Sequence, residues 1–202
     1  MKSNKALLIF LLLATSALYA SAKDEAKDVS KLTTNEISIR SVQGETTQPL
    51  KATTGKATVL IFSLADCPIS NAYSPELKRI QTEFSKKEIP FYIVYTDPDR
   101  TKDEITTHLK DYSLDGFTAI HDKAHTLVKA VGARVTPEAV VIDSQGNITY
   151  RGRINDRYAG YGKRRQHVSE HNLKDAINAA LAGKRVAKPR VKALGCFIPT
   201  LD

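Results

Sequence analysis

Apolar residues in this chain fall into short continuous runs, separated by segments in which they recur every three or four positions. The runs at 58–64 and 89–96 are almost unbroken, which is typical of strands covered on both faces. The segment 36–42 instead alternates apolar and polar residues, and 144–147 is a turn that joins two runs as a hairpin. The predicted strands are 36–42, 58–64, 89–96, 117–121, 138–143 and 148–152.

Four segments carry the helical spacing. In the first, Tyr73, Leu77, Ile80 and Phe84 form one apolar stripe, and Pro75 is expected to kink the helix. The second opens with Thr101-Lys-Asp-Glu104, which predicts a capping box. The predicted helices are 71–84, one running from 101 to 112, 124–131 closed by Gly132, and a last one capped by Ser169, with Leu173, Ile177 and Leu181 on one face and Gly183 at its end.

The order of these elements, β-α-β-α-β-α-β-β-α, predicts an α/β fold with a mixed central sheet and helices on both faces. We expect one domain at 36–183, with 43–56 as a loop and 153–168 as a long irregular segment rich in arginine, tyrosine and glycine. The flanks are a polar leader at 23–35 and a basic C-terminal tail at 184–202 that contains Cys196.

The first 22 residues have the pattern of a secretory signal peptide. Lys2 and Lys5 precede a short apolar core, and Ala20-Ser-Ala22 is a small-residue cleavage site. The apolar stretch is shorter than the roughly 20 residues that a spanning helix needs, so no stable membrane span is expected after cleavage. The prediction is a periplasmic or secreted protein, in a compartment where disulfides persist.

The formal net charge is +8, partly from arginines and lysines in 151–165 and 184–192. A basic face can attract nucleic acid. No nucleic-acid motif accompanies it and export separates the protein from most nucleic acid, so we expect a solvated basic face and no nucleic-acid partner.

Cys67 stands between the apolar run 58–64 and the first helical segment. A cysteine at a helix N-terminus is stabilised as a thiolate by the exposed amides and the helix dipole. The thiolate is the nucleophile in thiol chemistry, so Cys67 is the candidate catalytic residue. The chain has one other cysteine, Cys196.

Two segments resemble the thioredoxin superfamily, and most closely its periplasmic thioredoxin-like and redoxin branch, related to TlpA and to the AhpC/TSA proteins. The first is Phe62-Ser-Leu-Ala-Asp-Cys-Pro-Ile-Ser-Asn-Ala-Tyr-Ser-Pro-Glu-Leu77, in which Pro75 follows Cys67 by eight positions, as in the family. The second, Val135 to Gly152, is similar to the family's T-P-x-x-x-x-I-D-x-x-G segment. The resemblance covers roughly 36–183 and implies a thioredoxin-like fold.

The resemblance also implies roles for individual residues. Pro137 would be a cis-proline beside the reactive thiol, and Thr136, Pro68 and Asp66 would border the substrate. The family's C-x-x-C is C-x-x-S here, because Ser70 replaces the second cysteine. Such a site cannot close the usual local disulfide, but it can attack a substrate disulfide, with Ser70 as a hydrogen-bond donor to the thiolate.

Asp66 stands where the family has tryptophan. It either opposes thiolate formation by its like charge or relays protons.

Cys196 is the candidate resolving thiol. It lies in Gly195-Cys-Phe-Ile198, a small apolar patch in an otherwise basic tail, so the patch is expected to dock on the domain. A buried free thiol, a tail contact unrelated to catalysis, and pairing between two chains are the alternatives.

The leading hypothesis is an exported thiol–disulfide oxidoreductase that acts on protein or small-molecule thiols and disulfides and needs no cofactor or metal. One alternative is a peroxiredoxin-like thiol peroxidase, although Leu60 and Leu64 replace that family's proline and Thr/Ser, and its arginine would have to be Arg151 or Arg153. The other is a non-catalytic copper-binding or chaperone module of the same fold. For copper, the candidate ligands are Cys67 with His121 or His167, and His167 with His171.

Overall fold

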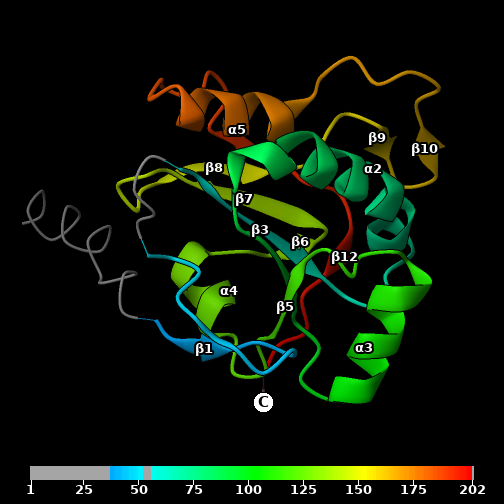
Figure 1. Ribbon diagram of the computed structural model, residues 1–202. Helices are drawn as coiled ribbons and strands as arrows, with labels where there is room; N and C mark the ends of the chain where they lie inside the picture. Colours follow the sequence, from blue (N-terminus) through cyan, green and yellow to red (C-terminus); the bar gives the residue numbers. More distant parts are fainter. Residues whose placement is uncertain (1–36, 52–55, 202) are drawn as a thin grey trace, which may run out of the picture. The chain divides into compact units, whose positions relative to one another are not determined.

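A six-stranded mixed sheet forms the centre of the protein (Figure 1). The computed structural model describes residues 37–51 and 56–201, so the predicted signal peptide at 1–22 and leader at 23–35 lie outside the described residues. The predicted thioredoxin-like α/β fold is confirmed. In spatial order the strands are β11 (Arg190–Val191), β8 (Ile148–Gly152), β7 (Glu138–Ile142), β3 (Thr58–Ser63), β4 (Phe91–Tyr95) and β5 (Thr118–His121).

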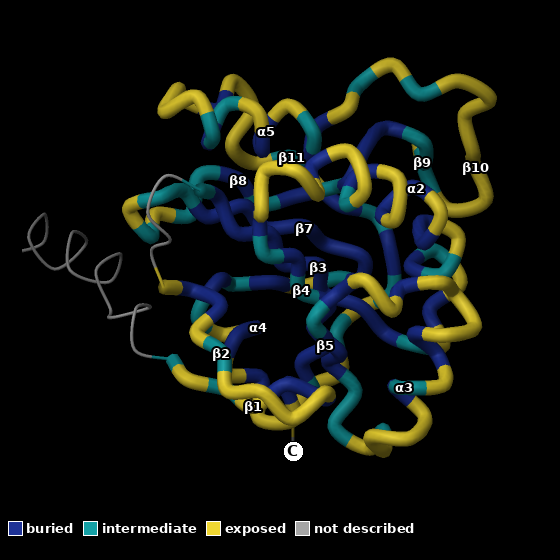
Figure 2. Tube along the Cα trace, viewed as in Figure 1, coloured by how far each residue is buried: buried dark blue, intermediate teal, exposed yellow. Residues whose placement is uncertain are grey.

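Strands β3, β4 and β5 run parallel, and β7 is antiparallel to both of its neighbours, β3 and β8. All six residues of β3 are buried, because both of its faces are covered. Val59 and Ile61 pack into a cluster with side chains of α2, α3 and α5, whereas Leu60 and Phe62 pack into a second cluster with α4. Figure 2 shows β3 and β7 as a buried layer inside more exposed helices and loops.

The first long helix, α2 (Pro68–Phe84), begins three residues earlier than predicted. Proline is favoured at the first helical position because its missing N–H would have no intrahelical partner there, so the helix starts directly after Cys67. The apolar stripe of Tyr73, Leu77, Ile80 and Phe84 is buried as expected, and the helix continues through Pro75. A short 3₁₀ turn, η3 (Ser85–Lys87), follows it.

The predicted capping box opens α3 (Lys102–Asp111). The Thr101 hydroxyl accepts from the Glu104 amide, and the Glu104 carboxylate accepts from the Thr101 amide. The next helix, α4 (Thr126–Val131), ends as predicted at Gly132, whose φ of 69° suits a residue without a Cβ.

The strand expected at 36–42 is not part of the central sheet. Among its described residues, 37–42, the strand that forms is β1 (Ile39–Arg40), which pairs with β2 (Thr46–Thr47), inside the segment expected to be a loop. The chain turns back at Gly44, which has a φ of 103°, after a single bridge from Ser41 to β5. An alternating pattern predicts a half-buried strand but does not select its partner.

The last helix, α5 (Asn172–Leu181), begins after His171 and not at the predicted cap Ser169. Ser169 turns its hydroxyl and its amide to the Asp156 carboxylate instead. The segment expected to be irregular contains a small hairpin of β9 (Tyr158–Gly160) and β10 (Lys163–Arg164).

The described part of the C-terminal tail pairs with the domain through two short strands. Its first strand, β11, extends the central sheet parallel to β8. Its second, β12 (Cys196–Phe197), pairs antiparallel with β6 (Val135–Thr136), and Figure 1 shows this red segment crossing beside β6. The tail therefore returns Cys196 to the segment that precedes Pro137.

Candidate active site

Cys67 is the N-cap residue of α2, between the end of β3 and the first helical turn. Its side chain is only 1% exposed. The Sγ atom lies 3.2 Å from the carbonyl oxygen of Thr136, to which the thiol donates a hydrogen bond. A thiol in this position has the unpaired amides of α2 directly in front of it, the environment that favours a thiolate.

The Thr136–Pro137 peptide bond is cis. The family resemblance predicted a cis-proline at Pro137, and the backbone agrees with that prediction. The hydrogen bond from Cys67 to the Thr136 carbonyl places β6 beside the thiol, although the two residues are 69 positions apart in the sequence.

The tail brings the second cysteine to the same place. In the β12–β6 ladder Cys196 is opposite Thr136, and Phe197 is opposite Val135. The Ile198 amide continues the pairing with a 3.1 Å hydrogen bond to the Arg134 carbonyl. Cys67 and Cys196 are both free thiols in this structure.

The two thiols are close enough to shift each other's acidity in opposite directions. Burial alone would raise the pKa of Cys67, but interactions with Cys196 and Ser70 outweigh it and hold that pKa below its ordinary value. Burial and the neighbouring Cys67, with a smaller contribution from the Asp66 carboxylate, raise the pKa of Cys196 to about 12. Cys67 is therefore the more acidic thiol of the pair, and Cys196 the one that holds its proton more strongly.

Two hydroxyls beside Cys67 have no hydrogen-bond partner among the described residues. They belong to Ser70, in the first turn of α2, and to Thr136, on β6, and both oxygen atoms are buried. Ser70 is among the groups that lower the pKa of Cys67. Buried polar atoms are nearly always paired, so two unpaired hydroxyls in residues next to Cys67 are unusual.

Asp66 is exposed, and its carboxylate lies 3.5 Å from the Arg100 guanidinium. Pro68 opens α2 immediately after the thiol. A groove of about 420 Å³ adjoins this side of the site, and Cys67 does not line it. Its lining residues are Leu64, Asp66, Asp97, Pro98, Asp99, Pro199, Thr200 and Leu201.

A polar chain that the sequence did not reveal holds the loop before Cys67. The Asn71 side-chain amide donates to the Ala65 carbonyl at 2.8 Å, so its oxygen accepts from His108 Nε2 at 2.9 Å. His108 Nδ1 then accepts from the Tyr95 hydroxyl at 2.8 Å. Burial lowers the pKa of His108, which agrees with the neutral ring that this pattern requires. In the sequence, the only indication of this chain of hydrogen bonds is an asparagine, Asn71, four residues after Cys67.

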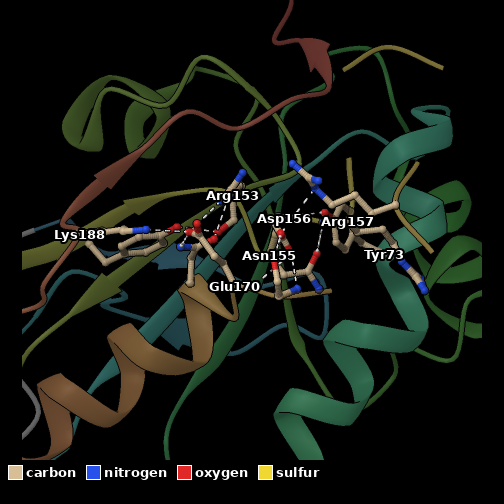
Figure 3. A network of polar contacts seen from close by, with 11 residues as sticks. Tyr73, Arg153, Asn155, Asp156, Arg157, Glu170 and Lys188 are labelled. Carbon is tan, nitrogen blue, oxygen red and sulfur yellow. Dashed lines mark hydrogen bonds and ion pairs between the residues drawn. The ribbon is translucent and has the colours of Figure 1, made fainter. Parts of the chain in front are cut away.

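The segment 153–169 is fixed by a second network, shown in Figure 3. The Asn155 side chain accepts from the Tyr73 hydroxyl at 2.9 Å, which joins the segment to α2. The buried Asp156 carboxylate accepts from the amides of Ser169 and Glu170 and lies 3.5 Å from Arg165. These contacts join the segment to α2 and to the residues before α5.

Tyr161, from the turn between β9 and β10, reaches the tail. Its hydroxyl donates a 2.8 Å hydrogen bond to the Gly195 carbonyl, next to Cys196. The sequence allows segment 153–168 to flank the thiol, to hold the tail or to cover the sheet edge, and it does not identify the partner of Tyr161, because residues 34 positions apart give no local pattern.

Of the candidate copper ligands, His121 is engaged elsewhere, because its Nε2 contacts the Asp97 carbonyl at 2.8 Å. His171 is the N-cap residue of α5, and its side chain makes no capping hydrogen bond. Within residues 37–51 and 56–201, no three His, Cys, Asp or Glu side chains gather as a metal site. In the same part of the chain, no helix is both long and apolar enough to cross a membrane.

The sequence matches the Redoxin family over residues 21–162, and the chain belongs to that family. Two similar solved structures are hypothetical protein SMc02350 from Sinorhizobium meliloti 1021 and an uncharacterized conserved protein from Geobacillus kaustophilus. The first is 22% identical with a TM-score of 0.67, covering 80% of this chain and 89% of that one. The second is 21% identical with a TM-score of 0.69, covering 82% and 88%.

The structure of dsbF from MTB, in mixed oxidized and reduced forms, is 18% identical with a TM-score of 0.55, covering 73% of this chain and 96% of that one. At these identities the likeness establishes a shared thioredoxin-like fold. No curated protein matches the sequence.

Proposed function

We propose that this protein is an exported thiol–disulfide oxidoreductase in which Cys67 is the nucleophile and Cys196 the resolving thiol. The observation that carries the proposal is the meeting of a thiol of lowered pKa at a helix N-terminus with a second thiol in register with Thr136. The thioredoxin-like fold shared with dsbF from MTB agrees with this chemistry. The signal-like residues 1–22 support a periplasmic or secreted location.

Each neighbouring group has a role in this chemistry. Ser70 and the amides of the first turn of α2 stabilise the Cys67 thiolate. The Thr136 backbone and Pro137 fix the edge along which an extended substrate or the tail can pair. Pro68 and Asp66 border the approach to the sulfur, and Asp66 also keeps Cys196 protonated by its charge.

The decisive experiment follows the Cys67 and Cys196 thiols through glutathione exchange, with disulfides mapped by mass spectrometry. Oxidised glutathione should convert the native protein to an intramolecular Cys67–Cys196 disulfide. Cys67→Ser should abolish exchange, and Cys196→Ser should stop at a mixed disulfide of Cys67 with glutathione. If neither substitution alters thiol exchange, the proposed function is wrong.

A thiol peroxidase of the same fold is the second candidate. The two unpaired hydroxyls of Ser70 and Thr136 favour it, because they could bind the oxygen of a peroxide at the Cys67 sulfur. The candidate arginines are occupied, Arg151 by the carbonyls of Val131 and Gly132 and Arg153 by Glu170. Consumption of hydrogen peroxide far faster than by free cysteine, and lost in Cys67→Ser, would favour the peroxidase.

A further inference from the structure

The docked tail both completes the site and closes it. Disulfide exchange requires the attacking sulfur to reach an external sulfur, yet Cys67 is 1% exposed. The segment 195–198 is what lies against Thr136 at this point, through the β12–β6 ladder. An external disulfide can reach Cys67 only when this segment moves away, and Cys196 can attack only when it returns.

Segment 195–198 is held by few contacts, as a displaceable segment must be. The ladder with β6 is two residues long, and Phe197, on the side of the strand opposite to Cys196, is 77% exposed and buries little apolar surface. The other attachments are the Ile198–Arg134 backbone hydrogen bond, the hydrogen bond from Tyr161 to the Gly195 carbonyl, and the packing of the half-buried Ile198 side chain against the α4-side core cluster. A segment with one half-buried apolar side chain and a two-residue ladder opens at a smaller cost in free energy than the core strands.

Gly195 is the position at which docking depends on the absence of a side chain. A Cβ built there would lie 1.9 Å from the Thr136 carbonyl oxygen, and 2.6 Å from its carbon. Both are backbone atoms and cannot rotate aside. Gly195 does not have a positive φ, so an alanine there would be unfavourable only because the tail could no longer approach β6.

We propose that Gly195 and Tyr161 are positioning residues that hold segment 195–198 as a displaceable gate over Cys67. Release of the gate admits an external disulfide, and re-docking presents Cys196 to the mixed disulfide. This inference rests on the proposed function for its second half, whereas the gate itself is a property of the fold.

The chemistry balances in two exchanges with a disulfide R–S–S–R. With the gate open, the Cys67 thiolate forms a bond to one sulfur, the R–S–S–R bond breaks, and RS⁻ leaves with the electron pair. With the gate closed, Cys196 loses its proton to solvent and attacks the Cys67 sulfur, and the second RS⁻ leaves. Two protein thiols are oxidised by two electrons to one disulfide, and R–S–S–R is reduced to two thiols.

The order of these steps follows from the charges. While Cys67 is a thiolate, it raises the pKa of the adjacent Cys196 thiol and keeps it inactive. In the mixed disulfide Cys67 carries no charge, so that effect disappears and Cys196 becomes the stronger nucleophile. Docking of the tail is therefore productive only after Cys67 has reacted.

The gate is tested without turnover, by alkylation of Cys67 with iodoacetamide across pH. All proteins carry Cys196→Ala, so that Cys67 is the single thiol. The pH midpoint of the rate reports the pKa of Cys67, whereas the plateau at high pH reports access to the sulfur. Gly195→Ala should raise the plateau by about tenfold or more, since it blocks docking. Tyr161→Phe, which removes one hydrogen bond, should raise it about fivefold.

Gly160→Ala is the matched control, because a Cβ there meets only Lys163 side-chain atoms at ordinary contact distance. If the high-pH alkylation rates of both Gly195→Ala and Tyr161→Phe equal that of the control, the proposed gate is wrong. Circular dichroism checks folding, and Tyr161→Phe decides the matter if Gly195→Ala does not fold.

The same substitutions in the protein with both cysteines test re-docking. Gly195→Ala should react faster with oxidised glutathione yet accumulate the mixed disulfide, which a loss of fold would not produce. A raised alkylation plateau without any glutathione exchange would contradict the proposed function and leave the gate standing. Faster exchange with unchanged resolution by Cys196 would instead overturn the positioning role.

Discussion

At the scale of single residues, the site depends on an asymmetry between two thiols. The pKa of Cys67 is lowered and the pKa of Cys196 is raised to about 12, although both cysteines lie next to Thr136. At Cys67, interactions with Cys196 and Ser70 outweigh burial and lower the pKa, whereas at Cys196 burial, the neighbouring Cys67 and the charge of Asp66 all raise it. A pair with separated pKa values has a defined nucleophile.

Replacing Cys196 with alanine should raise the pKa of Cys67 toward its ordinary value. The thiol of Cys196 is the largest of the groups that lower that pKa, and its removal leaves the effect of burial less opposed. Thiolate absorbance in the ultraviolet, followed against pH, measures the shift. Cys196→Ser, which keeps a hydroxyl donor, should shift the pKa less, and an unchanged midpoint in Cys196→Ala would contradict the contact between the thiols.

Asn71→Ala should destabilise the protein by about 2 kcal/mol. The substitution leaves His108 Nε2 and the Ala65 carbonyl without their partner, and a buried unpaired polar group costs about 1–3 kcal/mol. Urea unfolding measures the change. Gln81→Ala, which removes an exposed hydrogen bond to the Gly116 carbonyl, is the control and should change stability by much less.

At the scale of elements, the segment 153–169 is an ordered structure that joins α2, α5 and the tail. Its hydrogen bonds go to Tyr73 on α2 and to Ser169 before α5, and its β9–β10 hairpin carries Tyr161 to the tail. Asp156 is central because its carboxylate accepts three of these hydrogen bonds while almost fully buried. The polar and aromatic side chains of the segment therefore anchor it to α2, to the residues before α5 and to the tail.

Asp156→Asn should lower stability by about 2 kcal/mol at neutral pH, the range for hydrogen bonds to a charged group. Burial opposes the charge, but hydrogen bonds from Ser169 and Glu170 and the charge of Arg165 hold the pKa of Asp156 well below its usual range. A lowered folded-state pKa means that this stabilisation is complete above the ordinary aspartate pKa of about 4 and is lost as the pH falls further.

Urea unfolding of both proteins against pH checks this expectation. The difference between native protein and Asp156→Asn should be constant near neutrality and should shrink in acid below about pH 4. A difference that does not depend on pH would show that the charge of Asp156 is not what stabilises the segment.

At the scale of the whole molecule, the tail pairs with two separate strands of the domain, β8 and β6. It adds β11 to the central sheet and then places β12 beside β6, so the chain after α5 is part of the folded unit and of the site. A disulfide between Cys67 and Cys196 would close most of the described chain into one loop.

Oxidation should therefore stabilise the native protein by several kcal/mol, up to about 5 kcal/mol for a loop of this length. The lowered pKa of Cys67 stabilises the reduced folded form and makes the gain smaller. Urea midpoints of oxidised and reduced protein measure it, and Cys196→Ser should show no such dependence on redox state. Equal midpoints in the native protein would argue against an intramolecular disulfide.

The sequence determined the elements whose cause is local. Continuous apolar runs gave β3 and β4, the Thr101–Glu104 pair gave the start of α3, and Gly132 gave the end of α4. The position of Cys67 and the family motif also located the thiol at the helix start and the proline beside it. These features depend on a few adjacent residues, so their physical causes can be read along the chain.

Only the tertiary structure decided what lies opposite Cys67. The pairing of Cys196 with Thr136, the hydrogen bond from Tyr161 to Gly195, and the placement of β1 outside the central sheet all join residues far apart in sequence or select among possible partners. Each strand can pair with any strand edge that has unpaired backbone groups, and the local sequence pattern does not indicate which edge it will select. The position of Cys196 next to Thr136 is therefore a product of the fold, because a ladder two residues long in the tail brings it there.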